Sequence, residues 1–356
     1  MTRVRPTWPD LPAHVRDAIV AKLGGPVTAW ASHDGGYSPG WALSLESASG
    51  SAFVKVASTE YEVAARLHRR EAQRAAALPD GVPAPAFRWI MELPDAGAAD
   101  RAAVDRAVVD RGAVDPGAVE PAVVDRGAVD PGVADPAWVV IASDVVHGRV
   151  PRTEPWDLDD LDRLQHLACR IAEHEVPAGG VFPAFSDKVW PDAALLADER
   201  PAGLTTYDPW LAANLDQVAA LAAPERQAEA FAGPHLVHAD LRADNALIVR
   251  RPAGEEAVAV DWPHALRGAP FLDQTGMLPA VHATGGPAPH EVLERTPLPN
   301  GFDPEAVTVW VAVLTAYFAR NSLQDPPPGI PHLRAFQRIQ AEACIPWLRD
   351  RINNAE

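Results

Sequence analysis

The amino-acid sequence predicts an α+β fold with two lobes. The small N-terminal lobe contains an antiparallel sheet and one main helix, and the larger C-terminal lobe is mainly helical. The chain has 356 residues, more than one hydrophobic core usually organises, so two lobes are expected. Strand-like segments around a glycine turn come first, and helical patterns dominate afterwards. This change of pattern places the lobe boundary between residues 1–145 and 146–356.

The N-terminal lobe is predicted to begin with a short amphipathic helix over residues 11–23 and to continue with strands over residues 30–56. A glycine-rich tip at residues 35–40 predicts a hairpin between the first two strands. Backbone N–H groups at such a tip can bind phosphates, and a plain turn without a ligand is the alternative. The candidate phosphate contacts in the tip are Gly35, Gly36 and Ser38.

A lysine interrupts the apolar strand predicted over residues 51–57. The chain has three Lys against 28 Arg, so Lys55 indicates a site that fits a compact ammonium better than a planar guanidinium. The alternative is a Lys on the solvated face of an edge strand. The next predicted helix, over residues 59–78, offers Glu71 as a partner for Lys55. Competing acids near the start of that helix are Glu60 and Glu62.

Two further strands are predicted over residues 87–92 and 138–145, and a repeat lies between them. Acidic residues recur at every fifth position from Asp95 to Asp135, a period that fits neither a helix nor a strand. Repeated Pro excludes a regular helix, and Ala and Val supply little apolar surface to offset the entropy of ordering. We therefore expect the insertion 95–136 to be a disordered loop; a compact structure or a partner-binding role is the alternative.

Three long helices are predicted in the C-terminal lobe. The first follows Asp157, a favoured N-cap, and Asp159 and Asp160 in its first turn suit the helix dipole; contacts of these acids with a substrate are the alternative. The second follows Asp303-Pro304, with a cap and an N1 proline in the favoured order. The residues expected on the inward faces are Leu158, Leu161, Leu164, Ala168 and Ile171 in the first helix, Val307, Trp310, Leu314 and Phe318 in the second, and Phe336, Ile339, Ala343 and Trp347 in the last.

The most informative segment is the run His238-Ala239-Asp240-Leu241-Arg242-Ala243-Asp244-Asn245, which lies between two short apolar strands. A turn containing Pro and Gly leads to a third strand over residues 257–260, which ends at Asp261. Asp240 can accept a proton from an attacking hydroxyl, while Asn245 and Asp261 are hard oxygen ligands of the kind that Mg²⁺ prefers beside phosphates. This spacing predicts phosphoryl transfer. An Asp that caps a turn and an Asn in a left-handed conformation are the structural alternative.

Charge and cysteine content exclude several classes of protein. The formal net charge is −17, which argues against nucleic acid or anionic lipid as the main partner and is compatible with a cationic small molecule. The repeat contributes −5 of this charge and leaves −12 for the rest. Cys169 and Cys344 have no paired metal spacing. Without an apolar h-region or an uncharged run of membrane-spanning length, the sequence predicts a cytoplasmic protein.

From about Trp30 to Leu348, apart from the repeat, the chain resembles the aminoglycoside phosphotransferase family, which shares the bilobal fold of protein kinases. The run from His238 to Asn245 and the segment Val260-Asp261-Trp262 are similar to that family's catalytic loop and Asp-Trp metal motif. The resemblance implies transfer of the γ-phosphoryl group of ATP or GTP to a hydroxyl of a small molecule, such as an aminoglycoside or another antibiotic.

The resemblance also implies a role for each matching residue. Asp240 would be the catalytic base, and Asn245 and Asp261 would be the Mg²⁺ ligands. Lys55 would contact the α- and β-phosphates, with Glu71 as its partner. These roles would place a nucleoside triphosphate with Mg²⁺ beside a hydroxylated acceptor.

One further acid matches the family pattern, and other positions differ from it. Asp273 resembles a family acid that supports the catalytic segment structurally. Ala239 and Arg242 replace the Gly and His that are common in the family loop, which leaves the chemistry intact and the acceptor open. No Ala-Pro-Glu segment follows Asp261, so regulation by activation-loop phosphorylation is not expected.

Two functions from other classes compete with this hypothesis. The first is a metal-dependent hydrolase, because several side chains have plausible spacings for a transition metal. Its candidate ligands are His235, His238, Asp240, Asp261 and His264. The second is a non-catalytic nucleotide-binding regulator that uses the acidic repeat as an interaction arm. Bound metal and acceptor-dependent release of ADP would separate the three readings.

Overall fold

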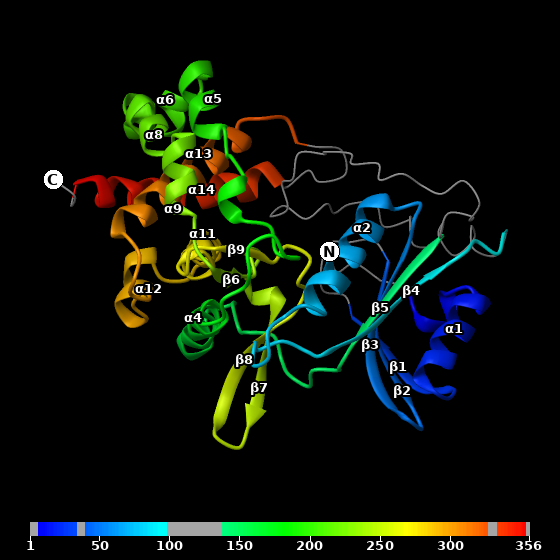
Figure 1. The fold of residues 1–356 in the computed structure, drawn as a ribbon. Helices are drawn as coiled ribbons and strands as arrows, with labels where there is room; N and C mark the ends of the chain where they lie inside the picture. Colours follow the sequence, from blue (N-terminus) through cyan, green and yellow to red (C-terminus); the bar gives the residue numbers. More distant parts are fainter. Residues whose placement is uncertain (1–5, 34–39, 98–136, 327–332, 354–356) are drawn as a thin grey trace. The chain divides into compact units, whose positions relative to one another are not determined.

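The computed structural model describes residues 6–33, 40–97, 137–326 and 333–353 (Figure 1). The glycine-rich tip with Gly35, Gly36 and Ser38 lies outside the described residues. The same holds for residues 98–136, nearly all of the predicted disordered insertion. Among the described helices, none is long and apolar enough to cross a membrane.

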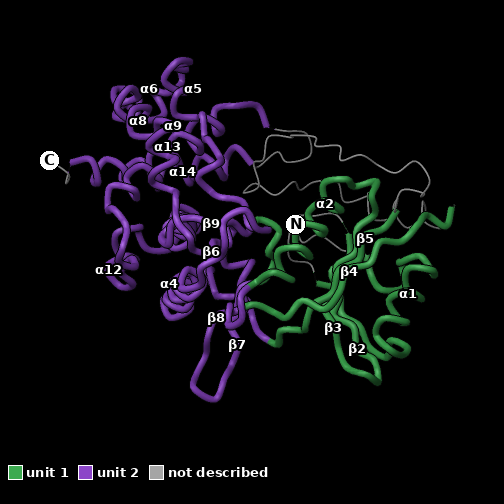
Figure 2. The backbone as a smooth tube through the Cα atoms, viewed as in Figure 1, with its two compact units in different colours: residues 1–78, 84–147, 260–264 green, residues 79–83, 148–259, 265–356 purple. Residues whose placement is uncertain are grey.

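The chain divides into two compact units, each built from segments that are not contiguous in sequence (Figure 2). Unit 1 comprises Met1–Leu78, Ala84–His147 and Val260–His264. Unit 2 comprises Pro79–Pro83, Gly148–Ala259 and Ala265–Glu356. Each unit is described by itself below.

Unit 1 is built on a five-stranded antiparallel sheet with the order β1-β2-β3-β5-β4. Its strands are β1 Val27–Ser32, β2 Trp41–Ser47, β3 Gly50–Ser58, β4 Phe87–Leu93 and β5 Trp138–Ser143. Its helical segments are η1 Trp8–Asp10, α1 Ala13–Leu23 and α2 Glu62–Ala75. Helix α1 ends at Gly24, whose φ of 76° is the left-handed conformation that a helix C-terminus often needs.

The register of β3 decides where Lys55 points. Lys55 lies opposite Ala42 on β2 and Ile141 on β5, so β3 is an interior strand and the edge-strand alternative is wrong. Val54 and Val56 belong to the core cluster that includes α1, and alternation along the strand directs Lys55 to the other face. On that face Ile141 packs with residues of α2. Lys55 is thereby brought to the helix that carries Glu71.

Unit 2 contains two small antiparallel sheets and most of the helices. The sheets pair β6 His235–Val237 with β9 Leu266–Gly268, and β7 Ala246–Arg251 with β8 Gly254–Ala259. The helical segments are α4 Leu158–Ala172, η2 Phe185–Asp187, α5 Asp192–Glu199, α6 Leu204–Tyr207, α7 Pro209–Ala213, α8 Leu215–Leu221, α9 Pro224–Ala230, η3 Ala243–Asn245, α10 Leu272–Gly276, α11 Leu278–Ala283, α12 Pro289–Arg295, α13 Pro304–Ser322 and α14 Leu333–Asn353.

The predicted N-caps of two long helices are confirmed. Asp157 accepts hydrogen bonds from the backbone N–H groups of Asp159 and Asp160 at the start of α4. Asp303 does the same for Glu305 at the start of α13. Helix α13 is buried at every position from Ala306 to Ala319 and packs against α14, α5 and α9, so it forms the centre of this unit's core.

Two residues expected on inward faces are exposed instead. Leu158 is 42% exposed, because it is the first residue of α4 and the buried side of that turn is occupied by Asp160. Ile339 in α14 is 44% exposed, and the prediction of its face is wrong. The buried residues of α14 include two glutamines that an apolar pattern misses, and they are Gln337, Gln340, Ala341, Ala343, Cys344, Ile345, Trp347 and Leu348.

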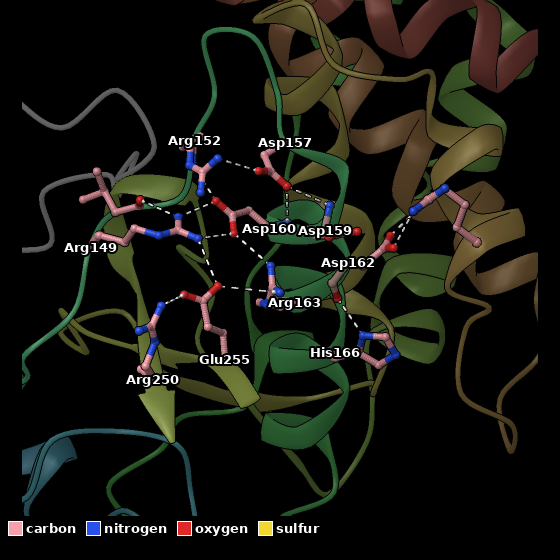
Figure 3. Close-up of polar contacts among 12 residues, drawn as sticks. Arg149, Arg152, Asp157, Asp159, Asp160, Asp162, Arg163, His166, Arg250 and Glu255 are labelled. Atoms are coloured by element: carbon pink, nitrogen blue, oxygen red, sulfur yellow. Dashed lines mark hydrogen bonds and ion pairs between the residues drawn. The ribbon is translucent and has the colours of Figure 1, made fainter. Parts of the chain in front are cut away.

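An ion-pair network around one buried carboxylate joins the start of α4 to the hairpin of β7 and β8 (Figure 3). The Asp160 carboxylate is fully buried and accepts from Arg149 at 2.5 and 2.9 Å and from Arg163 at 3.0 Å. The backbone N–H of Arg152 adds a fourth bond at 3.0 Å. Glu255 on β8 lies 3.3 Å from Arg149 and 3.6 Å from Arg163. Burial would raise the pKa of Asp160, but the bonds from Arg149 and Arg152 lower it below its ordinary value.

Candidate functional site

In unit 1, one ammonium group joins two carboxylates that come from distant parts of the sequence. Lys55 Nζ lies 2.7 and 2.8 Å from the two carboxylate oxygens of Glu71 and 2.8 Å from Oδ1 of Asp261. Lys55 is supplied by β3, Glu71 by α2, and Asp261 by the segment that follows β8. Glu71, rather than an acid at the start of α2, is therefore the partner of Lys55. The three side chains carry a net charge of −1, which favours an additional cation.

Burial strengthens the interactions among the three charges of this cluster. The side chains of Lys55 and Glu71 are 18% and 12% exposed, whereas that of Asp261 is 38% exposed. Burial opposes the charge of Lys55, but Asp261 and Glu71 together raise the pKa of the ammonium above its ordinary value. Burial and the nearby Asp261 carboxylate raise the pKa of Glu71, and the Lys55 ammonium opposes that shift. Lys55 is therefore a fixed cation in this unit.

The backbone of Asp261 has a φ of 68°, in the left-handed region that a non-glycine residue adopts at a cost of about 1–2 kcal/mol. The following residue, Trp262, is 2% exposed, and its backbone N–H bonds the Glu71 carboxylate. Packing of Trp262 thus holds the turn at Asp261 in place. Strained backbone of this kind is typical of residues whose position the surrounding structure over-determines.

In unit 2, the run from His238 to Asn245 forms a tight loop between β6 and β7 that ends in η3. Asn245 closes this loop, because its amide Nδ2 donates to the backbone carbonyl of Asp240 at 2.8 Å and to Asp240 Oδ2 at 2.9 Å. Asn245 is 4% exposed, and the side chain of Asp240 is 9% exposed. The Asp240 carboxylate is thus held by a neutral donor from its own loop.

Asp273 on α10 anchors the start of this loop. Its Oδ2 accepts the backbone N–H of His238 at 2.6 Å, and its Oδ1 accepts that of Ala239 at 2.8 Å. Burial raises the pKa of Asp273 to about 6, although these two hydrogen bonds oppose the shift. Ala239 has a φ of 63°, so the loop holds a side chain where the backbone favours glycine. Asp273 offsets part of that strain by binding both N–H groups around it.

Arg242 lies between two acids of the same loop. Its Nε and Nη2 atoms donate to the two carboxylate oxygens of Asp244, each at 3.1 Å. Its Nη1 lies 3.4 Å from Oδ1 of Asp240. The side chain of Arg242 is 19% exposed, while that of Asp244 is 43% exposed. The guanidinium therefore contacts the carboxylate oxygen of Asp240 that Asn245 does not bond.

Solved structures show which known architecture this arrangement belongs to. A GDP complex of a mutant aminoglycoside 2'-phosphotransferase IIIa matches 97% of this chain and 98% of its own, with a TM-score of 0.53 and 13% identity. A thermostable mutant of aminoglycoside phosphotransferase APH(4)-Ia in its apo form matches 94% and 99%, with a TM-score of 0.52 and 13% identity. APH(4)-Ia itself matches 93% and 97%, with a TM-score of 0.51 and 14% identity.

The chain has the fold of the aminoglycoside phosphotransferases. The predicted α+β, protein-kinase-like fold is thereby confirmed. Neither the family models nor the curated proteins with which the sequence was compared give a match. At 13–14% identity the likeness establishes the fold and leaves the chemistry to the residues themselves.

Within the aminoglycoside-phosphotransferase fold, the predicted site residues fall into two groups. Unit 1 brings Lys55, Glu71 and Asp261 together, and unit 2 brings Asp240 and Asn245 together. The pairing of Arg242 with Asp244 is a feature that the sequence analysis missed. Its signal was present, because an Arg two residues before an Asp in a tight loop is well placed for an ion pair.

Each of the two predicted Mg²⁺ ligands, taken by itself, offers the kind of donor that a hard divalent cation requires. Nδ2 of Asn245 faces Asp240, which turns the amide oxygen, a hard ligand, to the other side of the amide group. Asp261 presents a partly exposed carboxylate within a cluster that carries net negative charge. Both donors are oxygens, as Mg²⁺ requires, and neither is a thiolate or an imidazole.

The described residues do not form the transition-metal site that the hydrolase alternative requires. Among the residues that the structure describes, no three His, Cys, Asp or Glu side chains are grouped so that they could hold a metal ion. His235 Nδ1 instead contacts the backbone carbonyl of Ala172 at 2.7 Å. His238 is fully buried, and its Nδ1 lies 3.3 Å from the backbone N–H of Asp240. Both histidines thus have structural contacts within unit 2.

Proposed function

We propose that this protein is a phosphotransferase that moves the γ-phosphoryl group of ATP or GTP onto a hydroxyl group of a small molecule. The observation that carries the proposal is the Asp240 carboxylate, a nearly buried base held by Asn245 in a loop that Asp273 anchors. A carboxylate fixed in this way can orient an attacking hydroxyl and accept its proton.

The other residues have roles that follow from their charges. Lys55, held as a cation by Glu71, would bind the α- and β-phosphates, and Gly35, Gly36 and Ser38 would contribute backbone contacts. Asn245 and Asp261 would hold Mg²⁺. When bound, this ion neutralises charge on the β- and γ-phosphates. The chain's own residues thus position the donor and the acceptor, and such positioning accounts for most of catalysis in phosphoryl transfer.

The acceptor we propose is a cationic small molecule such as an aminoglycoside or another antibiotic. The net charge of −17 supports a cationic acceptor, because an acidic surface raises its local concentration. Neutral sugars are the comparison set, whereas amino-alcohols, which are protonated at neutral pH, belong with the cationic acceptors. The proposal therefore specifies the reaction and leaves the identity of the acceptor to be determined by experiment.

The test is acceptor-dependent release of ADP or GDP with Mg²⁺, measured for wild type, Asp240→Asn and Asp159→Asn across a panel of hydroxylated acceptors. Asp159 is an exposed acid on α4 and serves as a matched control for the loss of one carboxylate. We expect Asp240→Asn to lower kcat by about 100-fold or more, since general-base catalysis contributes on the order of 10²–10⁴. Equal turnover by wild type and Asp240→Asn would remove the proposed base.

A further inference from the structure

Each of the two carboxylate oxygens of Asp240 is contacted by a different donor of its own loop. Oδ2 accepts from Asn245 Nδ2 at 2.9 Å, and Oδ1 lies 3.4 Å from Nη1 of Arg242. One donor is a neutral amide and the other is a full cation. A carboxylate with contacts to both oxygens has a defined rotation about its terminal bond, so the direction of its lone pairs is fixed as well.

Arg242 is itself held in place by Asp244, so its contact with Asp240 differs from that of a mobile surface ion pair. Two of its nitrogens bind Asp244 side by side, both at 3.1 Å, which is the two-point geometry that only a guanidinium provides. The third nitrogen, Nη1, is then directed at Asp240. Asp244 is the more exposed partner, so it holds Arg242 from the solvent side. The order of support runs from Asp244 through Arg242 to Asp240.

We propose that Arg242 is a positioning residue for the base Asp240, and that Asp244 holds Arg242 in place. This inference rests on the proposed function, because it assigns a role toward the same base. Arg242 acts through Asp240 and needs no contact with the acceptor. A lysine at this position would keep the charge but would lack the planar fork, so it could not bind Asp244 side by side with two nitrogens while a third points at Asp240. The Arg242–Asp244 pair therefore matters for its geometry as well as for its charge.

Kinetics of loop variants test the role. Arg242→Gln is expected to lower kcat by about 10- to 100-fold, as misplacement of a reacting group does, with KM for the nucleotide changed less than about twofold. Arg242→Lys should restore part of the loss, and Asp244→Asn should show a smaller one because an amide keeps one acceptor oxygen. Arg250→Gln is the matched control, since Arg250 is an arginine of the same unit whose side chain is 88% exposed.

A purely structural role gives a different pattern. In that case Arg242→Gln would lower the free energy of unfolding, kcat of the remaining folded enzyme would stay at the wild-type value, and Arg242→Lys would bring no rescue of kcat. An unchanged kcat in Arg242→Gln, with wild type active, overturns the inference while leaving the proposed function intact.

A second measurement does not depend on turnover. The Nε–H signal of Arg242 in a ¹⁵N NMR spectrum, assigned by its loss in Arg242→Lys, reports the surroundings of the guanidinium. We expect this signal to move in Asp244→Asn and also in Asp240→Asn, because both acids contact the same group. A signal that moves in Asp244→Asn and stays in place in Asp240→Asn would show that Arg242 does not hold the base. That result would contradict the inference even if no acceptor were found.

Discussion

The Asp273 carboxylate accepts the backbone N–H of His238 at 2.6 Å, which ties α10 to the first residue of the loop that carries Asp240. Its other oxygen accepts the N–H of Ala239. An amide in place of this carboxylate has only one acceptor oxygen, so Asp273→Asn leaves one buried N–H without a partner. We expect the free energy of unfolding to fall by about 1–3 kcal/mol and kcat to fall with it. Urea unfolding measures the first, with Asp159→Asn as the control; wild-type stability would contradict the anchoring role.

The same carboxylate predicts a pH dependence of stability. Its pKa is about 6 in the folded protein, against an ordinary value of 3.8. Between these values the folded protein keeps a proton that the unfolded chain has released, so the contribution of Asp273 to the free energy of unfolding decreases as pH rises through this window. The stability difference between wild type and Asp273→Asn should therefore be larger at about pH 4 than at about pH 7. A difference that grows with rising pH would refute the assignment.

Lys55 is predicted to tolerate no replacement by arginine. Lys55→Arg keeps the charge beside Glu71 and Asp261 but places a larger head in a mostly buried cluster, so the free energy of unfolding should fall by about 1–3 kcal/mol. The broad planar head cannot occupy the position of one ammonium nitrogen that lies within 2.8 Å of both acids. We expect kcat/KM for the nucleotide to fall on the order of 100-fold, in a nucleotide-dependent assay. Lys22→Arg, at an exposed position of α1, is the control.

Asp160 should be the acid of α4 whose loss costs the most stability. It is fully buried and bound by two arginines, so Asp160→Asn leaves Arg149 and Arg163 only partly compensated. We expect a loss of about 3 kcal/mol in the free energy of unfolding, whereas Asp159→Asn on the same turn should stay within about 0.5 kcal/mol. Thermal and urea unfolding of the two variants side by side provide the measurement. Equal effects would mean that the network contributes little.

Ala239→Gly is predicted to stabilise the protein slightly. The φ of 63° costs an alanine about 1–2 kcal/mol, and glycine removes that cost while adding about 0.4–1 kcal/mol of freedom to the unfolded chain. The expected net gain is therefore about 0–1.6 kcal/mol in the free energy of unfolding. Ala243→Gly, in the same loop and without a positive φ, should instead lose about 0.5–1 kcal/mol. A loss in both variants would show that Ala239 is not strained.

Local features could be predicted from the sequence because neighbouring residues determine them. The caps at Asp157 and Asp303 depend on a side chain and the next few N–H groups, and both form as expected. Faces of helices are harder, because periodicity does not show what covers them. Leu158 lacks a covering element at the first turn of α4, and in α14 Gln337 is buried while Ile339 is exposed.

The site shows the same division between local and long-range information. Asp240 and Asn245 lie five positions apart, so their contact follows from one loop. Asp273 lies 35 positions from His238, and only the resemblance to a known family pointed to its supporting role. Asp261 contacts a lysine 206 positions away, and no pattern within the sequence measures such a distance. These long-range contacts depend on the packing of whole elements and need coordinates.

The interleaved segments of the two units limit how the polypeptide can be divided into fragments. Val260–His264 belongs to unit 1, yet the polypeptide on both sides of it belongs to unit 2. No single cut can therefore release either unit intact, and a fragment that stops at His147 would lack one of the two acids on Lys55. Fragment complementation or the exchange of lobes with a distant homologue would have to carry this five-residue insert along with the N-terminal piece.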